Sequence, residues 1–185
     1  MTGAVCTAHW RRIDGEGTDR CVLAKVDGGW LLSGQAHWRE NETEAQLTYA
    51  VRCDPAWQSL SADVAGRRGS DEIALRLLRD SGGWTLNGVA QPDTQTCTDI
   101  DLSFTPATNL LPLRRLVLDG PVPVPVTAAW LVPDLDAIRP LPQHYTRLDG
   151  DTYAYDSPGF TSRLTAHPSG FVTEYAGLWE GWVDG

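Results

Sequence analysis

The chain has 185 residues, of which 42% are hydrophobic and 21% are charged, and its formal net charge at pH 7 is −9. This length and composition suit a globular protein, and we expect a single domain over residues 1–185. The acidic balance disfavours nucleic acid as a partner, because affinity for a phosphate backbone comes from clustered Lys and Arg side chains.

The start of the chain, MTGAVCTAHWRR, does not have the basic end and continuous apolar run of a secretory signal. The longest apolar stretch, residues 122–133, is too short to span a membrane and is interrupted by two prolines. These features predict a soluble, cytoplasmic protein that is not embedded in a membrane. The cysteines are far apart and form no CxxC pair, so we expect unpaired thiols at Cys6, Cys21, Cys53 and Cys97.

An internal repeat is the clearest feature of the first half: GGWLLSGQA at residues 28–36 returns as GGWTLNGVA at residues 82–90. Each copy follows a strand-like run and opens with turn residues, which is typical of a β-hairpin. A looser third copy, RLTAHPSGFVTEY at residues 163–175, has Pro-Ser-Gly as its turn. The pattern predicts a hairpin-rich chain.

Alternation with a period of two residues predicts further strands. Short turns rich in Gly, Asp and Ser separate these strands, so we expect a mainly β fold with one long antiparallel sheet. The residues expected on buried faces are Ala45, Leu47, Tyr49, Val51 and Cys53, then Leu60, Ala62 and Val64, then Ile100, Leu102 and Phe104, and later Tyr153 and Tyr155.

One segment, LLPLRRLVL at residues 110–118, predicts a short α-helix with a proline in its first turn. So short a helix needs tertiary packing, which favours a sheet curled around it. Its apolar stripe is expected to contain Leu110, Leu113, Leu116 and Val117.

The chain contains the segments CTDIDLSFTPATNLLPLRR at residues 97–115, YAVRCDPAW at 49–57, RPLPQHYTRL at 139–148, YAYDSPGF at 153–160 and FVTEYAGLW at 171–179. Together these segments resemble the putative glycolipid-binding protein family of bacteria. The resemblance implies a spiral β-roll, in which a long antiparallel sheet curls around a single helix, together with a homodimer and a ligand cavity. It implies no catalytic residues.

Asp99 and Asp101 lie two positions apart in a predicted strand, so their carboxylates share one face. Such a pair permits hydrolysis of a glycoside or an ester, which is one alternative function. The simpler interpretation is that the helix returns Arg114 and Arg115 towards this strand and that an arginine pairs with a carboxylate. Neighbouring side chains on a helix point about 100° apart, so one arginine and not the other is expected to face the aspartates.

The eight tryptophans and five tyrosines have flat apolar faces with a polar edge, which suit a lipid or a sugar as well as an ordinary core. The leading hypothesis is non-catalytic binding of a small amphipathic ligand, a glycolipid or lipid-like molecule, in a cavity between the curved sheet and the helix. The other alternative is a dimeric interaction module with an exposed strand edge. The expected ligand-binding residues are Asp99, Asp101, Arg114, Arg115, Trp130, Tyr145, Tyr153 and Tyr155.

The sequence contains no GxSxG, HExxH or GxxxxGK pattern. Enzyme status stays open, because a catalytic site can be assembled from distant residues. His9 and His37 lie in the related pieces AHWRR and AHWRE, but no further ligands accompany them. We therefore expect no metal and no cofactor.

Overall fold

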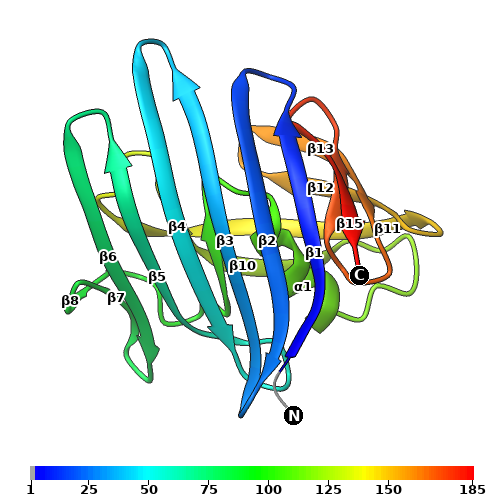
Figure 1. Ribbon diagram of the computed structural model, residues 1–185. Helices are drawn as coiled ribbons and strands as arrows, with labels where there is room; N and C mark the ends of the chain where they lie inside the picture. Colours follow the sequence, from blue (N-terminus) through cyan, green and yellow to red (C-terminus); the bar gives the residue numbers. More distant parts are fainter. Residues whose placement is uncertain (1–2) are drawn as a thin grey trace.

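The structure is a computed structural model that describes residues 3–185. Within this range, fifteen strands form one curved, open sheet, and one short α-helix lies against it (Figure 1). The order of strands is β8-β7-β6-β5-β4-β3-β2-β1-β15-β14-β13-β12-β11-β10-β9. The predicted mainly β, hairpin-rich fold is confirmed.

The first eight strands follow one another from β1, in the middle of the sheet, to β8 at one edge. The repeated Gly-Gly-Trp segments form the expected hairpins, β2–β3 and β6–β7. Gly28 has a φ of 83°, a left-handed conformation that glycine adopts without a steric penalty. The strands are β1 (Gly3–Arg12), β2 (Glu16–Val26), β3 (Gly29–Glu40), β4 (Thr43–Cys53), β5 (Ser59–Arg68), β6 (Asp71–Asp80), β7 (Gly83–Leu86) and β8 (Val89–Ala90).

The other seven strands lie on the opposite side of β1. The last strand, β15, pairs with β1, and the strands beyond it follow in reverse chain order to β9 at the other edge of the sheet. All neighbouring strands are antiparallel except β9 and β10, which are parallel and are connected through the helix. These strands are β9 (Asp99–Leu102), β10 (Val124–Leu131), β11 (Ile138–Asp149), β12 (Thr152–Ser157), β13 (Phe160–Ala166), β14 (Val172–Tyr175) and β15 (Trp179–Asp184).

Burial on β4 follows the predicted alternation. Its odd-numbered residues from 45 to 53 are buried on the inner face of the sheet, and Gln46, Thr48 and Arg52 are exposed on the outer face. The side chains of the inner face form the core, which extends into both halves of the sheet.

The prediction that Leu60 shares the buried face of Ala62 and Val64 is wrong. Leu60 is 46% exposed, whereas Ala62 and Val64 are buried. The reason is a bulge: Arg52 of β4 pairs with Ser61, but Cys53 pairs with Ser59, so Leu60 is the extra residue and points outwards.

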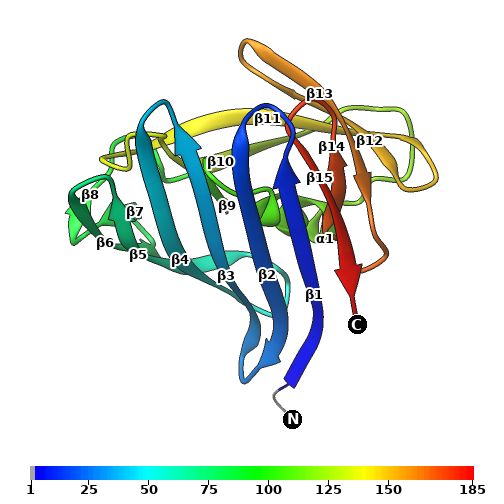
Figure 2. The same ribbon diagram turned by 45° about the horizontal axis from the view of Figure 1, so that its top comes forward.

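The sheet curls so far that the β9 end lies behind the first strands, as Figure 2 shows for β10 and β11. Ile100, Leu131 and Ile138 point to the outer face at this end, yet each is at most 1% exposed. The Ile100 N–H donates to the Ser59 hydroxyl oxygen of β5 at 3.0 Å. The β9 end is therefore covered on both faces, as in the spiral β-roll that the family resemblance implies.

Residues Ala107–Asn109 form a 3-10 turn, and α1 (Leu110–Arg115) follows it. The helix is three residues shorter than the predicted 110–118, because Leu116 is extended, with a φ of −78° and a ψ of 147°. The prediction that Val117 belongs to the apolar stripe is wrong, since it is 77% exposed. The extended Leu116 takes the chain out of helical phase, and Leu118 occupies a buried position instead.

No helix in residues 3–185 is long and apolar enough to cross a membrane. The four cysteines are buried and free, which confirms the expectation of unpaired thiols.

Candidate functional site

The predicted pairing of an aspartate with an arginine is present on the inner face of the sheet. Nε and Nη2 of Arg115 donate to Oδ1 and Oδ2 of Asp99 at 3.1 and 2.6 Å. The Asp99 side chain is 2% exposed and that of Arg115 is 19% exposed. The pKa of Asp99 is raised, because burial disfavours the carboxylate more than Arg115 favours it. Both carboxylate oxygens are thus engaged.

Asp101 shares the face of Asp99 but belongs to a second group of hydrogen bonds. Nε2 of Gln143 on β11 donates to Oδ2 of Asp101 at 2.7 Å, and the Tyr145 hydroxyl donates to Oδ1 of Asn109 at 3.1 Å. Burial, with the neighbouring charge of Asp99, raises the pKa of Asp101 to about 6. This group connects the β9 edge, β11 and the turn that precedes α1.

Tyrosine rings extend this polar group along the inner face. The rings of Tyr145 and Tyr155 meet edge to face with centroids 5.2 Å apart, and Tyr155 meets Tyr175 at 5.9 Å. Burial raises the pKa of Tyr155 to about 12, so its phenol is neutral at physiological pH. Trp130 of β10 lies in register with Asp101 on the same face and is partly buried.

A hollow of about 380 Å³ opens between α1 and the hairpins of β11–β14, and we call it the helix-side hollow. It contains the remaining two predicted residues, Arg114 of α1 and Tyr153 of β12. Nε of Arg114 donates to the Ser169 carbonyl oxygen at 2.8 Å, so this arginine turns away from the aspartates that Arg115 faces. The residues around the hollow also include Leu113, Arg147, Asp151 and His167.

A third buried carboxylate, Asp19, lies on β2 under the segment that precedes α1. The Tyr49 hydroxyl donates to its two oxygens at 2.9 and 3.1 Å, and the Thr105 hydroxyl makes a short hydrogen bond to Oδ2. Burial raises the pKa of Asp19 to about 7. Asp19 is only 2% exposed, and its contact with Thr105 holds the 103–109 segment against the sheet.

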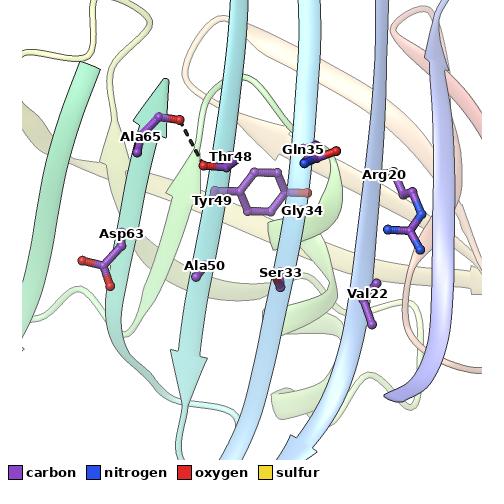
Figure 3. Close-up of a pocket in the computed structure, with 10 residues that line it drawn as sticks. All are labelled: Arg20, Val22, Ser33, Gly34, Gln35, Thr48, Tyr49, Ala50, Asp63 and Ala65. Carbon is purple, nitrogen blue, oxygen red and sulfur yellow. Dashed lines mark hydrogen bonds between the residues drawn. The ribbon is translucent and has the colours of Figure 1, made fainter. Parts of the chain in front are cut away.

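A second hollow, of about 370 Å³, lies on the outer face of β2–β5, and we call it the outer-face hollow. Figure 3 shows Arg20 on one side and Asp63 on the other, with short side chains such as Ser33 and Ala50 between them. In residues 3–185 neither charge has an oppositely charged group within 4.0 Å. None of the predicted site residues lies here.

Among the residues that the structure describes, no three His, Cys, Asp or Glu side chains come together as a metal-binding group. The His9 ring instead stacks on Trp182 and lies near Asp184, and His37 contacts Glu44.

The family model described as "Putative glycolipid-binding" matches residues 7–181. The chain belongs to this family. A solved structure, the crystal structure of a DUF1089 family protein from Pseudomonas aeruginosa, is similar to it with a TM-score of 0.75 and 29% sequence identity. The similarity covers 88% of this chain and 91% of the other. No curated protein matches the chain.

Residues 7–181 of this glycolipid-binding family member, which match the family model, include both the buried polar group around Asp101 and the helix-side hollow. Six of the eight predicted residues lie on or against the inner face near Asp101, and two lie in the hollow. Sequence reasoning missed Asn109, Gln143 and Arg147. Gln143 and Arg147 both had a usable signal, because they lie two residues before and two residues after Tyr145 on the same strand and so share its face.

Proposed function

We propose that this member of the glycolipid-binding family binds an amphipathic, lipid-like small molecule in the helix-side hollow, without catalysis. The observation that carries the proposal is the position of the hollow, which brings Leu113 and Arg114 of the helix opposite Tyr153 of the sheet. Its volume of about 380 Å³ falls in the range of small-molecule sites, roughly 300–1,000 Å³.

The surroundings of the hollow suit a molecule with a polar head and an apolar body. Leu113, Ala166 and the Tyr153 ring supply apolar contact, whereas Arg114 and Asp151 supply a donor and an acceptor for a head group. Tyr153 lies two residues before Tyr155 on the same strand face, so the hollow adjoins the buried row of tyrosines.

Titration with decyl maltoside, an uncharged glycolipid mimic, below its micelle concentration tests this proposal by calorimetry. We expect saturable binding that Tyr153→Ala weakens by about tenfold, since about 1.4 kcal/mol of aromatic contact is lost. Trp182→Ala is the control, because Trp182 is an exposed aromatic residue of β15 that lies outside the hollow. Absence of saturable binding to the parent protein, both of decyl maltoside and of an anionic amphiphile with the same alkyl chain, would sink the proposal.

The hydrolase hypothesis receives less support. Asp99 has both oxygens bound to Arg115 and is 2% exposed, which leaves it poorly placed to exchange protons with a substrate. Asp101, with a pKa of about 6, is the carboxylate of the pair that is better suited to proton transfer.

We also propose that the protein is a homodimer formed through the outer-face hollow. The free edges of the sheet offer little backbone for strand pairing, since β8 has two residues and β9 is covered. On the outer face, a two-fold axis midway between Arg20 and Asp63 would put each arginine opposite the partner's aspartate. The short side chains between them permit two sheets to pack closely.

A charge exchange tests this interface by light scattering. We expect Arg20→Asp or Asp63→Arg alone to shift the protein towards monomer, because like charges then meet, and the double variant to restore the dimer. Exposed Arg52, on the same face but outside the hollow, provides Arg52→Asp as a control. A monomeric parent protein, or a double variant as monomeric as the single ones, refutes the interface.

The unpaired state of the four buried thiols supports the cytoplasm as the proposed compartment, because disulfides are rare there. Cell fractionation with detection of the untagged protein would test this location.

A further inference from the structure

We infer that the head group of the ligand is anionic, of the phosphate, sulfate or carboxylate class, and that Arg114 and Arg147 hold it. This inference rests on the proposed function, because it names the chemistry that the helix-side hollow selects. It adds a charge requirement that the family description, with its reference to glycolipids, does not contain.

The first support is an excess of positive charge in an acidic protein. The net charge of the chain is −9, yet the helix-side hollow has two guanidinium groups, Arg114 and Arg147, and one carboxylate, Asp151. In residues 3–185 neither arginine has a carboxylate within 4.0 Å, whereas Arg12 and Arg115 are paired. The two cations are thus available to an outside anion.

The second support is that backbone carbonyls position both guanidinium groups. Nε of Arg114 donates to the Ser169 oxygen at 2.8 Å, and Nε and Nη2 of Arg147 donate to the Gly150 oxygen at 2.9 and 2.6 Å. A carbonyl orients a guanidinium without neutralising it, so each arginine keeps its full charge and further N–H groups for a ligand.

The third support is the packing around Arg114. Its Cζ lies 5.6 Å from the Trp57 ring centroid, and Trp57 stacks on Trp30 with centroids 4.3 Å apart. Gly170 leaves room for the stem of Arg114, because a Cβ there would lie 2.9 Å from its Nε and 3.1 Å from its Cγ. Although Arg114 is exposed, these contacts already position its side chain, so it loses less conformational entropy when it binds an anion.

Tyr153 and His167 complete the polar surroundings with groups that donate hydrogen bonds to an anion. Asp151 is the opposing charge, and its position favours a head group that also has a hydroxyl or another donor. Leu113 and Ala166 provide apolar contact, which an amphiphile can use and a free anion cannot, so the hollow favours the amphiphile.

The experiment compares three probes by calorimetry at low salt: decyl phosphate below its micelle concentration, decyl maltoside and inorganic phosphate. We expect decyl phosphate to bind at least tenfold more tightly than either of the others. Arg114→Gln and Arg147→Gln should each weaken decyl phosphate binding by about tenfold and change decyl maltoside binding by less than about twofold. Arg163→Gln, at an exposed arginine outside the hollow, should change neither.

Thermal melts of each variant keep loss of folding apart from loss of binding. Equal affinity for decyl phosphate and decyl maltoside would overturn the inference and leave the proposed function intact. Failure of both alkyl probes to bind would overturn the two together. Inorganic phosphate binding as tightly as decyl phosphate would also overturn it, because the hollow would then select a free anion and not an amphiphile.

Discussion

Replacement of Arg115 by alanine is expected to destabilise the fold severely, because it leaves the carboxylate of Asp99 buried without a partner. The pair is bidentate, and the Asp99 side chain is 2% exposed. Removal of one partner from a buried ion pair costs about 3–5 kcal/mol. For a protein of this size, each kcal/mol lowers Tm by about 2–4 °C, so the expected loss is roughly 6–20 °C.

Arg114→Ala is the control, since the neighbouring arginine is exposed and, within residues 3–185, pairs with no carboxylate. Its contact with the Trp57 ring is worth about 0.5–1 kcal/mol, a change of a few degrees at most. Asp99→Leu with Arg115→Met should be milder than Arg115→Ala alone, because two apolar side chains leave no buried charge.

The pH dependence separates lost charge compensation from lost packing. The pKa of Asp99 is already raised by burial, and without Arg115 it rises further. At acidic pH the carboxyl of the folded variant is therefore largely protonated and uncharged. The destabilisation by Arg115→Ala should therefore be smaller at pH 4.5 than at pH 8, as followed by thermal melts. A Tm loss below about 2 °C, or equal losses for Arg114→Ala and Arg115→Ala, would refute the reasoning.

Three further predictions concern residues away from this pair. Because the pKa of Asp19 is raised to about 7 in the fold, the free energy of unfolding should fall as pH rises from about 4 to 7. Asp19→Asn should reduce that fall, as measured by urea titrations at pH 5 and pH 8. An identical pH profile for the variant and the parent would count against this prediction. Gly34→Ala should lower Tm markedly, since a Cβ there would lie 2.2 Å from Cζ of Tyr49, whereas Gly3→Ala, with open space around it, should not. The four buried thiols should react with Ellman's reagent slowly in the native protein and fully in denaturant. The reason is that burial raises the pKa of Cys53 to about 12 and that of Cys97 to about 11. Rapid labelling of two or more thiols in the native protein would contradict this prediction.

Local pattern was sufficient for most of the fold. The hairpins around the Gly-Gly-Trp repeats and the alternation on β4 depend on neighbouring residues, and both are confirmed. The predictions for Leu60 and Val117 were wrong for a common reason. A bulge at Leu60 and the early end of the helix before Val117 each change which face of the element the following side chains occupy. Such local backbone geometry is not encoded in the hydrophobic pattern.

The residues of the candidate site were likewise predicted only in part. The pairing of one arginine with an aspartate follows from helical geometry, and the structure has it at Arg115 and Asp99. Arg147 could have been found from its position two residues after Tyr145 on the same strand. The role of Asp19 was beyond reach, because it depends on segments far apart in sequence, as in the contact of Asp19 with Thr105.

The pairing of β1 with β15 has a consequence for how the chain reaches its native state. The first and last strands meet in the middle of the sheet, where Arg11 and Glu180, 169 positions apart, contact each other. Hairpins within each half can form from near neighbours, but this central ladder requires the closure of nearly the whole chain. Folding should therefore be slow for a protein of this size, with the pairing of β1 and β15 among its late steps.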